Sequence, residues 1–180
     1  MSPSGGVKPM VVTEQQAAAF IDGYGLVLVA VFGSTPDDAE MDLLEVLVRG
    51  REKYLADRAL LDEALRNLEA HSILVPPEVE AAIRSLEVKR WFYLKDTGTY
   101  SVFIDPDEEV AYAVLGLTDR IRDILGGTGA LVEIGLVKYH GRYVCDGLVT
   151  SVVWLGSNYR KDLTRMLADI RARGAFRNVP

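Results

Sequence analysis

The first half of the chain has apolar residues at helical spacing. Thr13-Glu14-Gln15-Gln16 matches a capping box, which predicts a helix that begins there and ends near Asp22. The apolar run LVLVAVF at 26–32 is predicted to be a buried strand, with a continued helix as the open alternative. Helix-capping residues, prolines at helix starts and the spacing of apolar residues predict further helices over 34–49, 51–70 and 77–87. Gly50 would allow a bend between the first two.

From Val88 onward the pattern becomes typical of strands. Segments 91–95, 99–104 and 110–117 are rich in aromatic and β-branched residues and are separated by turn sequences. A short helix is predicted over 119–125. Two strands then flank a tight turn at His140-Gly141, which places Leu136 opposite Cys145. Strand character continues to Leu155, and a helix capped by Ser157 or Asn158 closes the chain near Gly174.

Helices first, strands second and a closing helix indicate an α+β fold with an antiparallel meander or hairpin sheet in the C-terminal half. We expect a flexible tail over 1–10 and a single α+β domain over 11–180. Its helical part would span 13–87, its sheet part 88–156 and its terminal helix 158–174.

Composition removes several classes of site. The chain has 180 residues, one cysteine, two histidines and a formal net charge of −6. A single cysteine cannot form an intramolecular disulfide or a cysteine-built zinc site, and two distant histidines do not suggest a metal site. We therefore expect no metal, no cofactor and no catalytic constellation. The N-terminus lacks a signal-peptide pattern and the longest apolar run is too short to span a bilayer, so a cytoplasmic protein without membrane contact is expected.

The single cysteine lies in the stretch KYHGRYVCDGLV, near a histidine and an aspartate. In the predicted hairpin Cys145 is roughly 16 Å along the strand from His140, whereas a nucleophile and its base need to be about 3 Å apart. Cys145 shares a strand face with Tyr143 and Val149, which indicates a core position. An approach of His71 to Cys145 through the fold is left open.

Two segments suggest nucleic-acid binding, although the acidic net charge disfavours it. The helix at 77–87 and the hairpin at 90–104 have the order of a winged helix, and the candidate phosphate contacts are Arg84, Lys89, Arg90 and Lys95. The second segment is the basic C-terminal helix, whose alternative interpretation is a solvated face over a core stripe. Its cations are Arg160, Lys161, Arg165, Arg171, Arg173 and Arg177.

Two other motifs favour structural roles. Asp105-Pro106-Asp107-Glu108-Glu109 lacks the glycine and the later glutamate of a calcium loop and is predicted to be a polar turn. Gly126-Gly127-Thr128-Gly129 follows a helix and precedes a strand, the reverse of a phosphate-binding loop, so it is predicted to be a helix C-cap. Aromatic residues of the strand half would form a protein or ligand surface wherever a sheet face is uncovered.

The segment EIGLVKYHGRYVCDGLV, followed by an arginine-rich helix that ends in Gly174, resembles the closing part of conserved bacterial proteins of unknown function. The resemblance covers only this strand-turn-DGLV-helix segment. It implies a bacterial, cytoplasmic protein and carries no catalytic residues over.

Three functional hypotheses follow. The first is a soluble, non-catalytic binding or regulatory module, with a homodimer or a protein partner compatible with its aromatic strand half. The second is a nucleic-acid-binding regulator that uses 77–104 or the C-terminal helix. The third is a small hydrolase or transferase that depends on carboxylates such as Asp105, Asp146 or Glu133.

Overall fold

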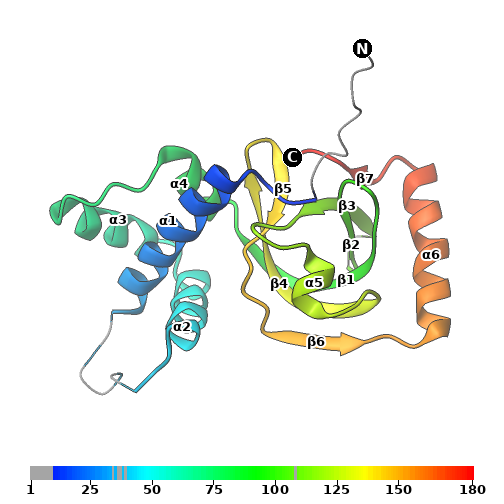
Figure 1. The fold of residues 1–180 in the computed structure, drawn as a ribbon, viewed down its shortest axis with the longest axis horizontal. Coiled ribbons are helices and arrows are strands. Elements are labelled where there is room, and N and C mark those ends of the chain that lie inside the picture. Colours follow the sequence, from blue (N-terminus) through cyan, green and yellow to red (C-terminus); the bar gives the residue numbers. More distant parts are fainter. Residues whose placement is uncertain (1–9, 34, 36–37, 39, 108) are drawn as a thin grey trace, which may run out of the picture. The chain divides into compact units, whose positions relative to one another are not determined.

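The structure is a computed structural model that describes residues 10–33, 35, 38, 40–107 and 109–180 (Figure 1). It confirms the α+β class. The chain divides into two compact units. We call Ala18–Arg84 the helical unit, and Met1–Ala17 with Ser85–Pro180 the barrel unit.

The first helix, α1, spans Glu14–Phe32. The predicted capping box is confirmed, because the Thr13 N–H donates to Gln16 Oε1 and the Gln16 N–H donates to Thr13 Oγ1. The predicted strand over 26–32 is wrong, since the helix continues through it. Buried side chains follow at helical spacing along the whole helix, at Ala17, Phe20, Tyr24, Val27, Leu28 and Val31. Burial of this stripe offsets the cost of about 1 kcal/mol for each glycine in the helix.

The remaining helices of this unit are α2 (Leu43–Ala56), α3 (Leu60–Ala70) and α4 (Pro77–Arg84). Asp42 caps α2 by accepting a hydrogen bond from the Glu45 N–H at 2.8 Å. The prediction that this helix begins at Ser34 or Thr35 is wrong, since α2 begins only at Leu43. Ser34, Pro36 and Asp37 lie outside the described residues.

No bend occurs at Gly50, because α2 passes straight through it and its backbone lies against the carbonyl of Leu28. This glycine allows two helices to approach closely.

By length and composition alone, α1 would suffice to cross a membrane, and 44% of its most apolar window is buried inside the structure. A core helix of a soluble protein and a signal sequence both meet this criterion. The cytoplasmic location therefore stays a prediction.

The barrel unit contains β1 (Glu87–Asp96), β2 (Ser101–Asp105), β3 (Val110–Leu115), β4 (Ala130–Tyr139), β5 (Arg142–Cys145), β6 (Ser151–Trp154) and β7 (Phe176–Arg177). Strands β1, β2 and β3 form an antiparallel meander. The sheet then closes, because β3 pairs in parallel with β5, and β4 pairs with both β5 and β1. It is thus a closed barrel rather than an open meander, which removes most exposed strand edges.

The β4–β5 hairpin has the predicted register. Leu136 pairs with Cys145, Val137 with Val144 and Tyr139 with Arg142. His140 and Gly141 both have positive φ angles, of 47° and 69°, as a two-residue hairpin turn of this hand requires.

Two helices cover the barrel unit (Figure 1). Helix α5 (Ile121–Leu125) ends at Gly126, whose φ of 81° confirms the predicted C-cap, and Ile121 packs into the barrel core. Helix α6 (Ser157–Ala172) packs Leu163, Leu167 and Ile170 onto the outer face of β1, β2 and β3. The predicted core stripe of α6 is confirmed, but its N-cap is Gly156 and not a side chain of Ser157 or Asn158.

Candidate functional site

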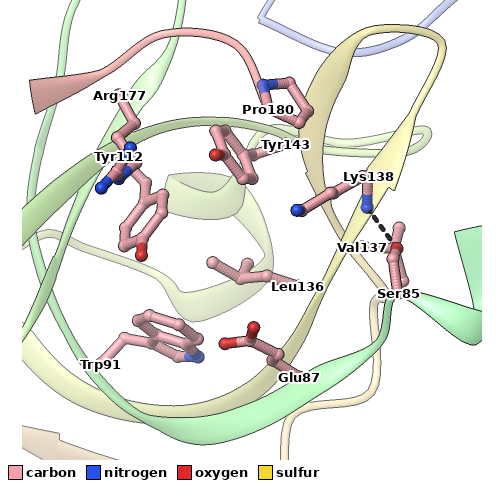
Figure 2. Close-up of a pocket in the computed structure, with 10 residues that line it drawn as sticks. All are labelled: Ser85, Glu87, Trp91, Tyr112, Leu136, Val137, Lys138, Tyr143, Arg177 and Pro180. Carbon is pink, nitrogen blue, oxygen red and sulfur yellow. Dashed lines mark hydrogen bonds between the residues drawn. The ribbon is translucent and has the colours of Figure 1, made fainter.

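A pocket of about 290 Å³ lies where β1 and β5 begin and β4 ends. Helix α5 lies between the end of β3 and the start of β4, so it is at the other end of the barrel. We call this space the barrel-end pocket. Figure 2 shows its lining, which consists of Ser85, Glu87, Trp91, Tyr112, Leu136, Val137, Lys138, Tyr143, Arg177 and Pro180.

Three aromatic rings from three strands form the apolar wall of the pocket. Trp91 and Tyr112 meet edge to face with ring centroids 5.7 Å apart, and Tyr112 and Tyr143 do so at 4.9 Å. The indole of Trp91 is held in place because its Nε1–H donates to the carbonyl oxygen of Ile134 at 3.0 Å. Leu136 of β4 completes the wall (Figure 2). Barrel closure assembles this wall, since β1 and β3 are not neighbours in the sheet.

Charged groups approach the pocket from three elements. Glu87 begins β1, Lys138 lies near the end of β4 and Arg177 belongs to β7. The pairing of β7 with β3 sets Arg177 beside Tyr112. The backbone N–H of Lys138 donates to Ser85 Oγ at 2.7 Å, which anchors the rim of the pocket (Figure 2).

Tyr143 is the polar residue set deepest in this lining, with 8% of its surface exposed. Its hydroxyl makes no hydrogen bond to any residue that the structure describes. Burial raises the pKa of the Tyr143 phenol, the positive charge of Arg177 lowers it and the negative charge of Glu87 raises it. The phenol therefore stays protonated at neutral pH, and both charged groups lie within electrostatic reach of it.

Three of the four cations of the proposed winged helix form ion pairs of their own. Arg84 belongs to the helical unit, where it pairs with Asp62 and Glu80. Lys89 Nζ lies 2.8 Å from the buried Asp105 carboxylate.

The other two cations lie further along β1. Arg90 follows Lys89 directly, so the two side chains point to opposite faces of the strand, and Arg90 lies 3.4 Å from Glu133. Lys95 is exposed. None of the four lines the barrel-end pocket.

The three candidate carboxylates each have a structural partner, and none lines the pocket. Asp105 pairs with Lys89, and Glu133 accepts from Thr150 Oγ1 at 2.7 Å. Asp146 accepts from the backbone N–H groups of Gly135 and Leu148. Across the described part of the chain, no group of three or more His, Cys, Asp or Glu could hold a metal ion.

Cys145 is completely buried in the barrel core, as predicted, and burial raises the pKa of its thiol to about 12. His71 is exposed on the helical unit, where its Nδ1 lies 2.8 Å from the carbonyl oxygen of Asn67. A fully buried, protonated thiol lacks the accessible thiolate that nucleophilic catalysis requires.

Sequence reasoning named the strand-half aromatics, with Trp91, Tyr112 and Tyr143 among them, as a ligand surface only where a sheet face is uncovered. Trp91 and Tyr143 instead belong to the barrel core, and Tyr112 packs against it. Sequence reasoning missed Glu87, Lys138 and Arg177 as partners of these rings. No local pattern relates three residues so far apart in the chain.

Comparisons with protein-family models, with curated proteins and with solved structures give no match. The barrel has the strand order β1-β2-β3-β5-β4, with β3 parallel to β5 and a helix between β3 and β4. Helix α6 packs on the outer face of β1, β2 and β3, whereas the barrel-end pocket is open.

Proposed function

We propose that the protein is a non-catalytic binding module that takes a small molecule in the barrel-end pocket. The observation that carries this proposal is the joining of three aromatic side chains, Trp91, Tyr112 and Tyr143, into one wall beside charged groups. Small-molecule sites are concave and mostly apolar, with a few polar groups that fix orientation.

The composition of the lining supports binding rather than catalysis. Among the described residues that line the pocket, Glu87 has the only carboxylate side chain, and none is a histidine or a cysteine. Paired-carboxylate hydrolysis needs two acids on either side of the scissile bond, and a nucleophile needs an adjacent base. The pocket residues match neither arrangement.

Tryptophan fluorescence tests the proposal directly, because the chain has only two tryptophans. In a Trp154→Phe background the signal comes from Trp91 alone, and a single-ring probe such as benzamide should change it saturably. Tyr112→Leu should weaken this response at least fivefold. Tyr100→Leu is the matched control, because Tyr100 is a half-buried aromatic residue of the β1–β2 turn that contacts Phe176 and does not line the pocket. An unsaturable response, or equal loss in both variants, would contradict the proposal.

A homodimer or a protein partner stays a prediction. Native mass spectrometry of freshly purified protein tests it, and the ratio of absorbance at 260 and 280 nm reports any retained nucleic acid. A dimer mass would support self-association. A mass of 19.8 kDa with an added small molecule would support the pocket proposal.

Nucleic-acid binding through Arg84, Lys89, Arg90 and Lys95, or through the C-terminal helix, also stays a prediction. It requires an affinity that falls steeply with salt. Arg90→Ala combined with Lys95→Ala should then weaken binding equally for all sequences. Unchanged binding in this double variant would exclude the winged-helix version.

A further inference from the structure

We infer that the barrel-end pocket selects a ring-sized organic molecule that carries an anionic oxygen group, either a carboxylate or a phosphate. This inference rests on the proposed function and names the class of ligand for the same site. It follows from the hydrogen-bonding groups that converge on the pocket and from the charges around them.

Three of the polar groups in the lining can serve as donors. Lysine and arginine side chains have no acceptor atom, so Lys138 and Arg177 can only donate. The Tyr143 hydroxyl is held protonated by burial and has no hydrogen-bond acceptor among the described residues. A ligand that satisfies all three must present acceptor oxygens toward them, and an anionic oxygen group does so with the strongest hydrogen bonds.

The cations of the pocket differ from their neighbours in the barrel unit. Lys89, Arg90 and Arg173 form ion pairs with Asp105, Glu133 and Glu109. Within the described residues, neither Lys138 nor Arg177 forms an ion pair. The lining thus holds two cations without an ion-pair partner among the described residues and one carboxylate side chain, Glu87, so on a chain of net charge −6 it is a place where a negative charge would be stabilised.

Glu87 gives the bound ligand a direction. It is the one acidic side chain among the described residues of the lining, and its carboxylate lies 3.6 Å from Lys89 Nζ. Figure 2 shows Glu87 beside Trp91, while Lys138 and Tyr143 lie on the other side of Leu136. The anionic group of the ligand therefore lies toward Lys138 and Tyr143, and its ring lies toward Trp91, while Arg177 reaches the ligand from beside Tyr112.

The size of the pocket sets the size of the ligand body. Its volume of about 290 Å³ lies just below the usual range of about 300–1,000 Å³ for ligand pockets. Trp91 and Tyr143 are almost fully buried, so the half-buried ring of Tyr112 presents most of the aromatic surface that a flat body could contact. A molecule with one substituted ring fits this description better than a polymer chain does.

Four probes that share one ring test the inference, with binding followed by the fluorescence of Trp91 in the Trp154→Phe protein at low salt. The probes are benzoate, phenyl phosphate, benzamide and benzylamine. We expect the two anions to bind at least tenfold more tightly than benzamide, and benzylamine to bind most weakly. The ratio between benzoate and phenyl phosphate identifies which anionic group is preferred.

Variants assign the selectivity to named residues. Arg177→Gln and Lys138→Gln should each weaken benzoate binding about tenfold, the value of one hydrogen bond to a charged group, and should leave benzamide binding within twofold. Tyr143→Phe should weaken both anions by a smaller factor. Glu87→Gln should strengthen anion binding and weaken benzylamine binding. Lys95→Gln is the control, because Lys95 is exposed on β1 outside the pocket.

The outcomes separate this inference from the proposed function. If benzamide binds as tightly as benzoate, the pocket binds small molecules without selecting anions, so the inference is wrong and the proposed function stands. If no probe produces a saturable change at Trp91, both are wrong. If benzoate binds tightly but Arg177→Gln and Lys138→Gln bind it unchanged, the assignment of the anion to these cations is overturned. Circular dichroism spectra of each variant verify that it is folded.

Discussion

The carboxylate of Asp146 lies against the backbone of Gly135, in the space that a β-carbon at position 135 would need. The two residues are joined in both directions, because the Gly135 N–H donates to Asp146 Oδ1 at 3.1 Å and the Asp146 N–H donates to the Gly135 carbonyl at 2.8 Å. The Leu148 N–H also donates to Asp146 Oδ1, at 3.0 Å, so this carboxylate oxygen accepts two hydrogen bonds. This cluster lies at the break between β5 and β6, where residues 146–150 separate two strands that both pair with β4.

Asp146→Ala should lower the free energy of unfolding by about 3 kcal/mol, because two buried N–H groups lose their acceptor. Asp146→Asn keeps an acceptor oxygen and should cost less than half as much. Urea denaturation followed by circular dichroism measures both values. Equal, small losses in the two variants would show that the carboxylate does not hold this strand break.

Cys145 should react with iodoacetamide only when the protein unfolds. Its thiol is completely buried and the pKa is raised to about 12, so the native protein presents almost no thiolate at pH 8. Mass spectrometry should show labelling within minutes in 6 M guanidinium chloride and none over the same time in buffer. Rapid labelling of the folded protein would contradict the buried position.

Because the pKa of the Cys145 thiol is raised in the folded protein, we expect the free energy of unfolding to depend on pH. The folded pKa of this thiol is raised above the ordinary value of 9.0 to about 12, so its contribution is fully present below pH 9 and is lost as pH rises through this interval. Between pH 9 and pH 12 the unmodified protein should lose more stability than Cys145→Ala, which has no thiol to ionise. Parallel pH profiles for the two proteins would refute this assignment.

Lys89 and Asp105 form an ion pair in which the side chain of Asp105 is completely buried. Lys89→Met should cost about 3 kcal/mol of stability, because it leaves a buried carboxylate without its cation. Asp105→Asn in the same protein should restore part of the loss. Lys95→Met on the same strand is the control and should change stability by about 0.5 kcal/mol at most. Thermal and urea unfolding give these values, and an equal effect at both lysines would contradict the special role of the buried pair.

Two glycines of the helical unit should respond in opposite directions to alanine. A β-carbon on Gly50 would overlap the carbonyl of Leu28, so Gly50→Ala should destabilise the protein by several kcal/mol through forced separation of α1 and α2. No atom lies within 4 Å of a β-carbon built on Gly25. Gly25→Ala should therefore stabilise the protein by about 0.5–1 kcal/mol through helix propensity. If both substitutions changed stability in the same direction, the close approach of α1 and α2 at Gly50 would not be retained in solution.

Local features of this protein could be predicted because neighbouring residues encode them. Thr13 and Gln16 cap a helix through bonds that span three residues. Strand alternation and a two-residue turn determine that Leu136 faces Cys145, and a helical repeat of apolar residues determines which side of α6 is buried. Each of these depends on periods and turns that lie within a few residues.

Only the tertiary structure decided the rest. Residues 26–32 suit either a strand or a helix. The described residues of the helical unit contain no strand that could pair with them, and the buried stripe that they share with Phe20 and Tyr24 favours the helix. The closing pairs β1–β4 and β3–β5 join segments far apart in the chain, and no local pattern chooses among such partners. The barrel-end pocket exists only after this closure, because Glu87, Lys138 and Arg177 become neighbours only when the pairings of β1, β4 and β7 are complete. The sequence by itself therefore determined those elements whose caps, turns and periodicity are local, and the global burial of apolar surface decided the ambiguous segment 26–32 and how the elements combine into a site.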